Sequence, residues 1–321
     1  MSEAAGSGPA PGRPSGAAGA RPARTPRPPA PSGLVIVDKP AGLTSHGVVA
    51  RVRRLAGTRR VGHAGTLDPM ATGVLVVGVE KATRLLGHLA LTEKEYTATI
   101  RLGQSTVTDD AEGEVTAAAP ATGVAREAVD AGVAALTGPI LQVPSKVSAI
   151  KVGGVRSYTR VREGEEFELA ARPVTVHSFT VHALREPADV PGVLDLDVTV
   201  VCSSGTYIRA LARDLGAGLG AGGHLTALRR TRVGPYALPA ARTLEQLEES
   251  FAVQPIEEAA AAAFPRWDVD VDQARLLGNG VRIAAPALGE GPHAAFGPDG
   301  RLLALVEEKS GQARIVAGFA S

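Results

Sequence analysis

The sequence predicts an α+β fold, in which a large mixed-sheet core with helices is followed by a small β-rich domain. Three observations support this prediction. The chain has 321 residues, of which 44% are hydrophobic and 21% charged, as is typical of a soluble globular protein large enough for two domains. Apolar patterns of both the strand and the helix period occur along the same region. Near residue 264 they give way to short apolar runs between turns.

Residues 1–32 are predicted to be a disordered tail. They hold eight prolines, eight alanines, five glycines and four arginines, and no aromatic residue. Such a segment cannot bury enough apolar area to offset the entropy lost on ordering. The folded part is expected to comprise a main domain over residues 33–255 and a small C-terminal domain over residues 265–321.

The main domain is expected to begin with a strand, a helix and a second strand. Residues 34–37 and 74–79 are short apolar runs typical of buried strands. Thr44 or Ser45 can cap the helix between them. The apolar face of that helix consists of Val48, Val52 and Leu55.

Strands and helices follow one another in the middle of the chain. Apolar and polar residues alternate over 96–102 and 194–202, which predicts half-buried strands. Residues 125–136 predict a helix, and another is expected from Thr206. The core face of the latter consists of Ile208, Leu211, Ala212, Leu215 and Leu219.

The end of the main domain carries a helix signal, and the C-terminal part carries strand signals. Thr243 and Gln246 fit a capping box for a short acidic helix. After the composition changes at Phe264–Trp267, turns such as Gly297–Gly300 separate short strands. This pattern favours a small β-rich domain.

Charge is segregated along the chain although its total is balanced. There are 34 lysines and arginines and 33 acids. Residues 46–67 and 209–232 each hold five arginines, with no acid in the first segment and only Asp214 in the second. Two such segments suggest a local polyanion-binding surface. From charge alone, random clustering on a solvated surface is the simpler explanation.

Several kinds of site are absent from the sequence. The single cysteine, Cys202, excludes an internal disulfide and a multi-cysteine zinc site. The seven histidines have neither HxH nor HExxH spacing, so no metal is expected. No apolar run is long enough to span a membrane and no signal peptide opens the chain, so a cytoplasmic location is expected.

Nucleotide-driven chemistry is also poorly supported. The G-x-G-x-x-G pattern at Gly218, Gly220 and Gly223 follows a predicted helix rather than a strand, which favours a helix end and a turn. The sequence contains neither a P-loop nor a G-x-S-x-G elbow.

The most informative stretch is Gly62–Gly73, with the sequence GHAGTLDPMATG. Pro69 keeps the backbone of Asp68 out of the helical region. A purely structural interpretation is that Asp68 caps a helix with Pro69 at its first position. A functional interpretation is that the glycines let a ligand approach the backbone around an aspartate that follows an arginine-rich segment.

This stretch resembles the catalytic-aspartate motif of the bacterial tRNA pseudouridine synthases of the TruB type, which act on uridine 55 of the T loop. Other stretches resemble further family motifs, in family order, from about Gly33 to about Leu244. They are Gly33–Leu43 with its Asp38-Lys39-Pro40, Lys94–Tyr96, Leu102–Asp109, Ser148–Lys151, Ala171–Pro173, Ser203–Arg209 and His224–Arg230.

The resemblance implies a fold, although the sequence departs from the family pattern at two positions. The fold is a pseudouridine-synthase catalytic core over 33–255, with a mixed, mainly antiparallel sheet, followed by a small PUA-like domain. Val147 stands where many relatives carry tyrosine, and Arg84 stands at a position often filled by lysine. No role is assigned to Val147.

Three catalytic residues are implied by the resemblance. Asp68 is the nucleophile, Arg209 grips its carboxylate, and Tyr96 stacks on the target base and takes part in proton removal. The reaction breaks the C–N glycosidic bond, rotates the uracil and joins C5 to the sugar. Because nothing is oxidised, added or lost, no cofactor and no metal are expected.

The resemblance and the charge pattern also predict contacts with RNA. The partner is the T stem-loop of tRNA, and a monomer is expected. His63 is expected to fill the space of the extruded base, and Tyr207 to support the pocket. The remaining predicted RNA-binding residues are Lys39, Arg59, Arg60, Arg84 and Leu228.

Two other functions remain as alternatives. A tRNA-binding or RNA-folding protein that docks on the tRNA elbow is compatible with the basic segments. An aspartate-nucleophile phosphohydrolase is disfavoured because position 70 is Met rather than a second acid.

Overall fold

The computed structural model describes residues 30–146, 151–152, 155–156 and 169–320. The predicted disordered tail lies outside these residues except for its last three. Val147 and most of the motif at 148–151 also lie outside the described residues.

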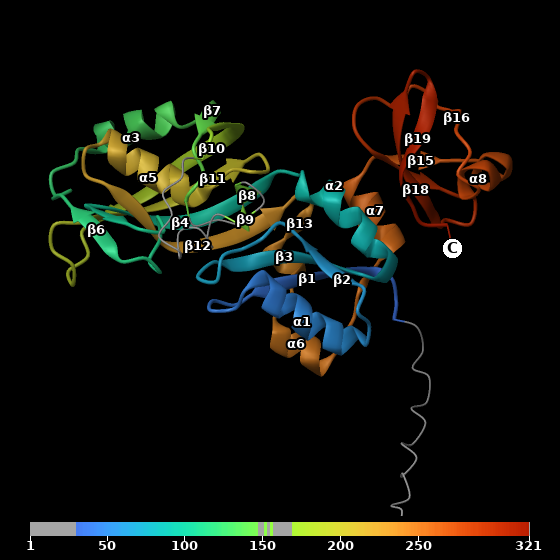
Figure 1. Cartoon of the computed structure of the whole chain (residues 1–321), viewed down its shortest axis with the longest axis horizontal. Coiled ribbons are helices and arrows are strands. Elements are labelled where there is room, and N and C mark those ends of the chain that lie inside the picture. Colours follow the sequence, from blue (N-terminus) through green and yellow to red (C-terminus); the bar gives the residue numbers. More distant parts are fainter. Residues whose placement is uncertain (1–29, 147–150, 153–154, 157–168, 321) are drawn as a thin grey trace, which may run out of the picture.

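A ten-stranded sheet forms the body of the described chain (Figure 1). Its main path runs β14-β1-β3-β12-β4-β11-β10-β7, with β2 beside β3 and β13 beside β12. These strands are β1 (Gly33–Lys39), β2 (Val61–Ala64), β3 (Thr72–Val79), β4 (Lys94–Leu102), β7 (Gly138–Gln142), β10 (Arg172–Arg185), β11 (Leu194–Cys202), β12 (Gly223–Val233), β13 (Tyr236–Ala237) and β14 (Gln254–Pro255). Every pair is antiparallel except β3 with β12. The mixed, mainly antiparallel sheet is therefore confirmed.

Helices cover the sheet on different faces along its length (Figure 1). They are α1 (Ser45–Ala56), η1 (Glu80–Leu85), α2 (Leu86–Ala90), α3 (Arg126–Ala135), α5 (Ile208–Gly218), η2 (Leu238–Ala240), α6 (Leu244–Glu249) and α7 (Ile256–Ala263). A further helix, α8 (Val271–Gly278), packs in the C-terminal part instead. Helices α3 and α5 pack on the face of β4, β10 and β11 from which Tyr96, Ala98 and Ile100 project. This packing brings the start of α5 close to the start of β4.

Strands β1 and β3 are buried on both faces, which explains their continuous apolar runs. On one face, Val35 and Val37 contact the buried side of α1 and α6. On the other, Leu34 and Ile36 belong to a cluster that contains side chains of η1, α2 and α7. The loops at the ends of these strands are therefore held between two packed layers.

The C-terminal part forms a second sheet of five strands, in the order β15-β17-β18-β19-β16. These strands are β15 (Arg266–Asp268), β16 (Ile283–Ala284), β17 (His293–Phe296), β18 (Leu302–Lys309) and β19 (Gln312–Gly318). Phe296, Leu302 and Phe319 share a core cluster with α7 and β1. The β-rich C-terminal part is confirmed, and helix α8 with its Asp270–Gln273 capping box was not predicted.

Two short hairpins complete the described chain. They are β5 (Gln104–Thr106) with β6 (Val115–Ala118) and β8 (Lys151–Val152) with β9 (Val155–Arg156).

Most element predictions with a clear period are confirmed. The strands at 34–37, 74–79, 96–102 and 194–202 and the helix at 125–136 are present. Thr44 caps α1 by accepting a hydrogen bond from the Gly47 N–H, and the Thr243–Gln246 capping box is formed. Strands β2, β10 and β12 were not predicted.

Two turn interpretations have opposite outcomes. The interpretation of Asp68 as a helix cap is wrong, because residues 65–71 form a loop between β2 and β3 and no described helix begins there. The Ala71 N–H donates to the Asp68 carbonyl at 3.1 Å, which closes a turn. The glycine pattern at 218–223 is indeed a helix end and a turn, since α5 ends at Gly218 and β12 begins at Gly223.

Candidate active site

A cavity of about 270 Å³ opens where the 65–68 loop, β4, β12 and the start of α5 meet. Five of the predicted site residues line it, namely Asp68, Tyr96, Tyr207, Arg209 and Leu228. Lys94 and Arg230 line the same cavity. The three predicted catalytic residues thus come together from three separate parts of the chain.

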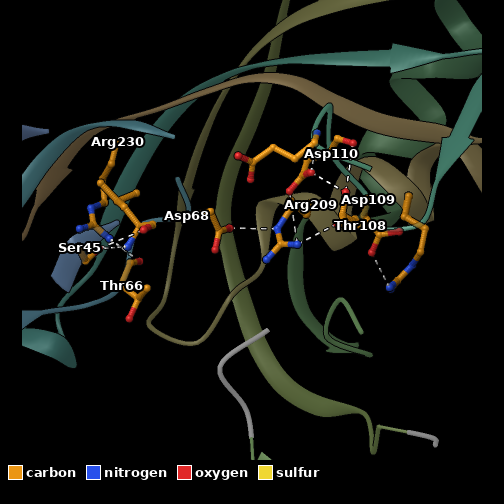
Figure 2. Close-up of polar contacts among 11 residues, drawn as sticks. Ser45, Thr66, Asp68, Thr108, Asp109, Asp110, Arg209 and Arg230 are labelled. Carbon is orange, nitrogen blue, oxygen red and sulfur yellow. Dashed lines mark hydrogen bonds and ion pairs between the residues drawn. The ribbon is translucent and has the colours of Figure 1, made fainter. Parts of the chain in front are cut away.

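Asp68 and Arg209 form an ion pair at the cavity wall (Figure 2). Nε of Arg209 lies 3.0 Å from Oδ2 of Asp68, and the Asp68 side chain is 36% exposed whereas that of Arg209 is 5% exposed. A charged hydrogen bond of this length stabilises the carboxylate as an anion. The carboxylate therefore faces the cavity while its cationic partner is buried in the fold.

A loop between β5 and β6 holds Arg209 on its other side (Figure 2). Nη1 of Arg209 donates to the Thr108 carbonyl at 2.8 Å and lies 3.4 Å from Oδ2 of Asp110. The Asp110 carboxylate also accepts hydrogen bonds from the Thr108 hydroxyl at 2.6 Å and the Glu112 N–H at 3.0 Å. The guanidinium is thus fixed by groups that do not line the cavity.

The loop that carries Asp68 is held by side chains from two neighbouring elements. Ser45, at the start of α1, donates to the Leu67 carbonyl at 3.0 Å and accepts from the Leu67 N–H at 2.9 Å. Lys39 donates to the carbonyls of Pro40 at 2.9 Å and Pro69 at 3.1 Å. Both residues flanking Asp68 are therefore hydrogen-bonded to fixed side chains.

Arg230 binds the same loop from β12 (Figure 2). Its guanidinium donates to the carbonyls of Val74 at 2.7 Å, Gly65 at 3.1 Å and Thr66 at 3.4 Å. Gly73 pairs with Arg230 in the parallel register of β3 and β12, and a Cβ at Gly73 would lie 2.2 Å from the Arg230 carbonyl oxygen. Only glycine allows this close approach.

Tyr96 and Leu228 form apolar parts of the cavity wall. Tyr96 lies on β4, and Leu228 lies on β12 opposite Ala98. Burial raises the pKa of the Tyr96 hydroxyl, which keeps the ring neutral. A buried aromatic ring beside an aliphatic side chain offers a flat apolar surface to a planar ligand.

Tyr207 is positioned through its backbone at the start of α5. The Gln142 side chain accepts from the Tyr207 N–H at 2.8 Å and donates to the Tyr207 carbonyl at 3.1 Å. Gln142 is buried, so strand β7 fixes the turn that precedes Arg209.

Apart from Lys39, four predicted RNA-binding residues lie outside the cavity lining, on three different parts of the chain. His63 lies on β2 with its ring edge-on to His46 at 5.4 Å between centroids, and burial lowers its pKa. Arg59 and Arg60 are exposed in the loop after α1, and Arg60 lies 3.7 Å from Glu80. Arg84 lies on η1 and donates to the Gly318 carbonyl at the end of β19. These residues therefore do not extend the cavity itself.

Lys39 differs from the other predicted phosphate contacts because it is fully buried. Burial lowers the pKa of its ammonium group to about 8. In this position the group has no surface for a phosphate, and its hydrogen bond to Pro69 instead orients the turn that follows Asp68.

The arginines of the 209–232 segment do not form the exposed basic surface that the charge pattern suggested. Arg209 and Arg230 are buried. The other three form ion pairs within the protein: Arg213 with Asp109 and Asp214, Arg229 with Asp38, and Arg232 with Glu93 and Glu95. The segment therefore does not form a surface of exposed arginines without acidic partners, and a polyanion contact there stays a prediction.

Sequence reasoning missed four residues that shape the site. They are Ser45, Lys94, Asp110 and Arg230. Lys94 and Arg230 lie within stretches that resemble family motifs, and Asp110 directly follows one, so the signal was present without a role attached. The contacts of Ser45 with Leu67 depend on the tertiary fold, and no sequence signal pointed to them.

Within the described ranges, no three histidine, cysteine or acidic side chains are grouped in a way that could hold a metal ion. None of the described helices is both long and apolar enough to cross a membrane.

Three family models match the chain in succession. The model described as TruB family pseudouridylate synthase (N terminal domain) matches residues 53–208. The one described as tRNA pseudouridylate synthase B C-terminal domain matches residues 209–263. The one described as tRNA Pseudouridine synthase II, C terminal, matches residues 264–320. Together they include Asp68, Tyr96 and Arg209.

Curated relatives match over nearly their whole length. A tRNA pseudouridine synthase B of Streptomyces griseus is 70% identical over 292 residues, which cover 90% of this chain and 98% of that protein. Proteins of the same name from Thermobifida fusca and an Arthrobacter species are 64% and 62% identical, each over 90% of this chain and at least 97% of their own.

Solved structures share the fold at lower identity. A chain in the structure described as Crystal Structure of a Cbf5-Nop10-Gar1 Complex matches with a TM-score of 0.67 and 26% identity, over 88% of this chain and 83% of its own. A chain in an H/ACA RNP bound to a substrate RNA containing 2′-deoxyuridine matches with a TM-score of 0.65 and 25% identity, over 89% and 84%.

Proposed function

This chain belongs to the TruB family of pseudouridylate synthases, and we propose that it converts uridine 55 in the T loop of tRNA to pseudouridine with Asp68 as nucleophile. It is a pseudouridine synthase, an isomerase that acts on tRNA, as are its relatives of at least 60% identity. The position of the target uridine and the roles of individual residues are the proposal.

The observation that carries the proposal is the Asp68–Arg209 pair at the wall of a cavity that Tyr96 also lines. A nucleophilic carboxylate must stay ionised in a partly desolvated site, and a guanidinium 3.0 Å away stabilises that charge. The carboxylate is the exposed member of the pair, so it is the one that can reach a substrate atom.

The reaction needs few functional groups. The carboxylate attacks either C1′ of the ribose or C6 of the uracil, the N1–C1′ bond breaks, and the base turns before C5 bonds to C1′. Tyr96 and Leu228 offer the uracil ring an apolar surface that retains it during the turn. Overall, a C5–C1′ bond replaces the N1–C1′ bond, C5 loses a proton and N1 gains one. No external reactant is therefore required.

RNA binding is proposed for the exposed groups outside the cavity. Arg59 and Arg60 lie in the loop that precedes β2, the strand that carries His63. Arginines in such a loop can contact phosphates near the T loop while His63 occupies the place of the extruded base. This arrangement supports the T stem-loop as the partner.

The decisive experiment compares Asp68→Asn with Asp130→Asn on an unmodified tRNA transcript, with pseudouridine mapped by carbodiimide labelling and primer extension. Asp130 is an exposed aspartate of α3 that pairs with Arg126, so its variant controls for loss of one surface carboxylate. We expect D68N to form no pseudouridine at position 55 and D130N to match the wild type. Turnover by D68N, or modification only at other positions, would overturn the proposal.

The alternative function, docking on tRNA without catalysis, makes a different prediction in the same experiment. If the wild type binds the transcript but forms no pseudouridine, docking is the function that stands. The cytoplasm is the proposed location because the substrate is tRNA, and the monomeric state stays a prediction for size-exclusion chromatography.

A further inference from the structure

Lys94 and Arg230 are two buried cations without an acidic partner among the described residues. Lys94 is 6% exposed and Arg230 is 1% exposed, yet neither forms an ion pair with a described carboxylate. Their hydrogen bonds go to uncharged groups. Lys94 donates to the carbonyls of Ala90 at 2.9 Å and Thr92 at 2.7 Å, and Arg230 donates to those of Gly65, Thr66 and Val74 and is also hydrogen-bonded to the Tyr96 side chain. Buried charges are usually paired, so this arrangement requires an explanation.

Arg230 differs in this respect from the other arginines of its segment. The other four arginines of the 209–232 segment each contact at least one carboxylate. The fold therefore supplies acids for the other four arginines of this segment, whereas Arg230 and the nearby Lys94 form no ion pair with a described carboxylate.

The two cations lie beside each other at the cavity. A Cβ built on Gly65 would lie 3.4 Å from Nη1 of Arg230 and 3.6 Å from Cε of Lys94. Both side chains line the cavity that contains Asp68 and Arg209. Burial, and then the charge of Arg230, lowers the pKa of Lys94 to about 8. Two like charges held together in a cavity favour an anion as the missing partner.

The proposed conversion of uridine to pseudouridine creates such an anion. When the N1–C1′ bond breaks, its electron pair stays with the uracil ring, where O2 and O4 share the negative charge. When C5 then bonds to C1′, the ring returns an electron pair, the proton of C5 is lost and N1 gains a proton. The detached base is therefore anionic only between these two steps.

We propose that Lys94 and Arg230 form a cationic wall that contacts the carbonyl oxygens of the detached uracil and stabilises its anionic form. This inference rests on the proposed function, and it adds two catalytic residues to Asp68, Arg209 and Tyr96. In this arrangement the Asp68 carboxylate, paired with Arg209, contacts C1′ of the sugar or C6 of the ring. The Lys94–Arg230 wall contacts the uracil that leaves. Donors placed where charge develops act most strongly in a site shielded from water.

An RNA phosphate is the other anion that two cations can bind. Lys94 and Arg230 are buried side chains that line the same cavity as Tyr96 and Leu228, a lining suited to a flat base. The exposed arginines 59 and 60 are better placed for phosphates. The leaving uracil is therefore the ligand that the geometry favours, and the experiment separates the two.

The test uses Lys94→Met, with Lys309→Met as the control because Lys309 is exposed at the end of β18. Arg230 is left intact because it also holds the loop of Asp68. Single-turnover rates of N1–C1′ bond cleavage, followed as loss of the starting nucleoside after digestion, are measured on two tRNA transcripts, one with uridine and one with 5-fluorouridine. Cleavage is the step compared because 5-fluorouridine has no proton on C5 to lose in the last step. Fluorine at C5 withdraws electrons and makes the uracil a better leaving group, so cleavage then depends less on a cationic wall.

We expect K94M to lower the rate on uridine by about 10²-fold, as for loss of one preorganised donor, with tRNA affinity unchanged. The loss on 5-fluorouridine should be clearly smaller, and K309M should match the wild type on both. An equal loss on both transcripts, or weaker tRNA binding at an unchanged rate, overturns the proposal, the second outcome indicating a phosphate contact.

Two further controls keep the result interpretable. If the wild type forms no pseudouridine at all, the proposed function itself fails, which is distinct from failure of the cationic wall. If circular dichroism indicates that K94M is not folded, Lys94→Gln replaces it under the same criteria, because its amide can still donate to the Ala90 and Thr92 carbonyls.

Discussion

The carboxylate of Asp110 lies 3.4 Å from Nη1 of Arg209, and its side chain is 2% exposed. The guanidinium that contacts Asp68 is therefore also paired with a buried acid on its far side. Together with the Thr108 carbonyl, Asp110 fixes the direction in which Arg209 presents its Nε. Asp110 is a positioning residue, because it reaches the cavity only through Arg209.

Replacing Asp110 by Asn should lower the single-turnover rate of pseudouridine formation by about 10-fold or more while tRNA affinity is preserved. The amide oxygen can still accept from the Thr108 hydroxyl, so the loop keeps its fold, but the charge that holds Arg209 is lost. Rate and binding are measured separately, by quench-flow and by filter binding.

The adjacent aspartate provides a matched control. Asp109 forms its ion pair with Nη1 of Arg213, at 3.3 Å, and its left-handed backbone suits Asn. D109N should therefore retain most of the rate. Equal losses in D109N and D110N would show that the loop, not the Asp110–Arg209 contact, determines the effect.

Replacing Ser45 by Ala should destabilise the protein by about 1–3 kcal/mol, because it leaves the buried N–H and C=O of Leu67 without their partner. The loop next to Asp68 then loses its link to α1, so the reaction rate falls as well. Urea unfolding and single-turnover kinetics measure the two effects.

The control is Thr44→Ala, which removes the cap of the same helix and costs about 1 kcal/mol. T44A should lose stability without a comparable loss of rate. A rate loss in T44A as large as in S45A would mean that α1 as a whole, rather than the Ser45–Leu67 contact, supports the loop.

Sequence reasoning located several strands whose apolar period is clear and missed β2, β10 and β12, of which β12 was missed because of its charged side chains. Strand β4 alternates cleanly and was predicted, whereas its neighbour β12 carries Arg229, Arg230 and Arg232 and reads as a basic segment. The partners of these arginines lie on β1, in the 65–74 region, and on β4 and the residue before it. Only the tertiary fold reveals that β12 is a central strand.

The site was predictable to the extent that motifs carried it. Asp68, Tyr96 and Arg209 lie in stretches that resemble family motifs, and the structure brings them to one cavity. Lys39 lies in such a stretch too, yet its expected phosphate contact depended on exposure, and exposure is set by packing. Charge alone therefore could not separate surface arginines from buried ones.

Arg84→Ala should loosen the C-terminal sheet rather than weaken RNA binding. Arg84 donates to the Gly318 carbonyl, and Lys81 on the same short helix donates to the Phe319 carbonyl at 3.1 Å. Loss of one such bond costs about 1 kcal/mol. Hydrogen exchange of β19 should become faster, while the salt dependence of tRNA binding should not change.

Arg59→Ala is the matched comparison, because the Arg59 side chain is exposed and the described residues give it no hydrogen-bond or ion-pair partner. The substitution should reduce the steepness of the plot of log K, the association constant for tRNA, against log salt concentration. The slope should change by about 0.9 if Arg59 contacts one phosphate of a paired stem. A similar drop in R84A would restore Arg84 as a phosphate contact.

Lys94 also predicts how stability depends on pH. Its pKa is about 8 in the folded chain, below the 10.5 of an unperturbed lysine, because burial and Arg230 disfavour its charge. Between these two values the unfolded chain binds more protons than the folded one, so the free energy of unfolding rises with pH. The rise is at most about 3 kcal/mol, at 1.36 kcal/mol for each pKa unit.

Urea unfolding of the wild type and of K94M at pH 7, 8, 9 and 10 isolates this contribution, because Lys39 and the tyrosines titrate in both proteins. The stability of the wild type relative to K94M should increase steadily above pH 8. At pH 7, K94M should be at least as stable as the wild type, since methionine removes a buried charge that has no acidic partner in the described chain. A difference that stays constant from pH 8 to pH 10 would mean that Lys94 is not held as a buried cation, and the cationic wall would lose its basis.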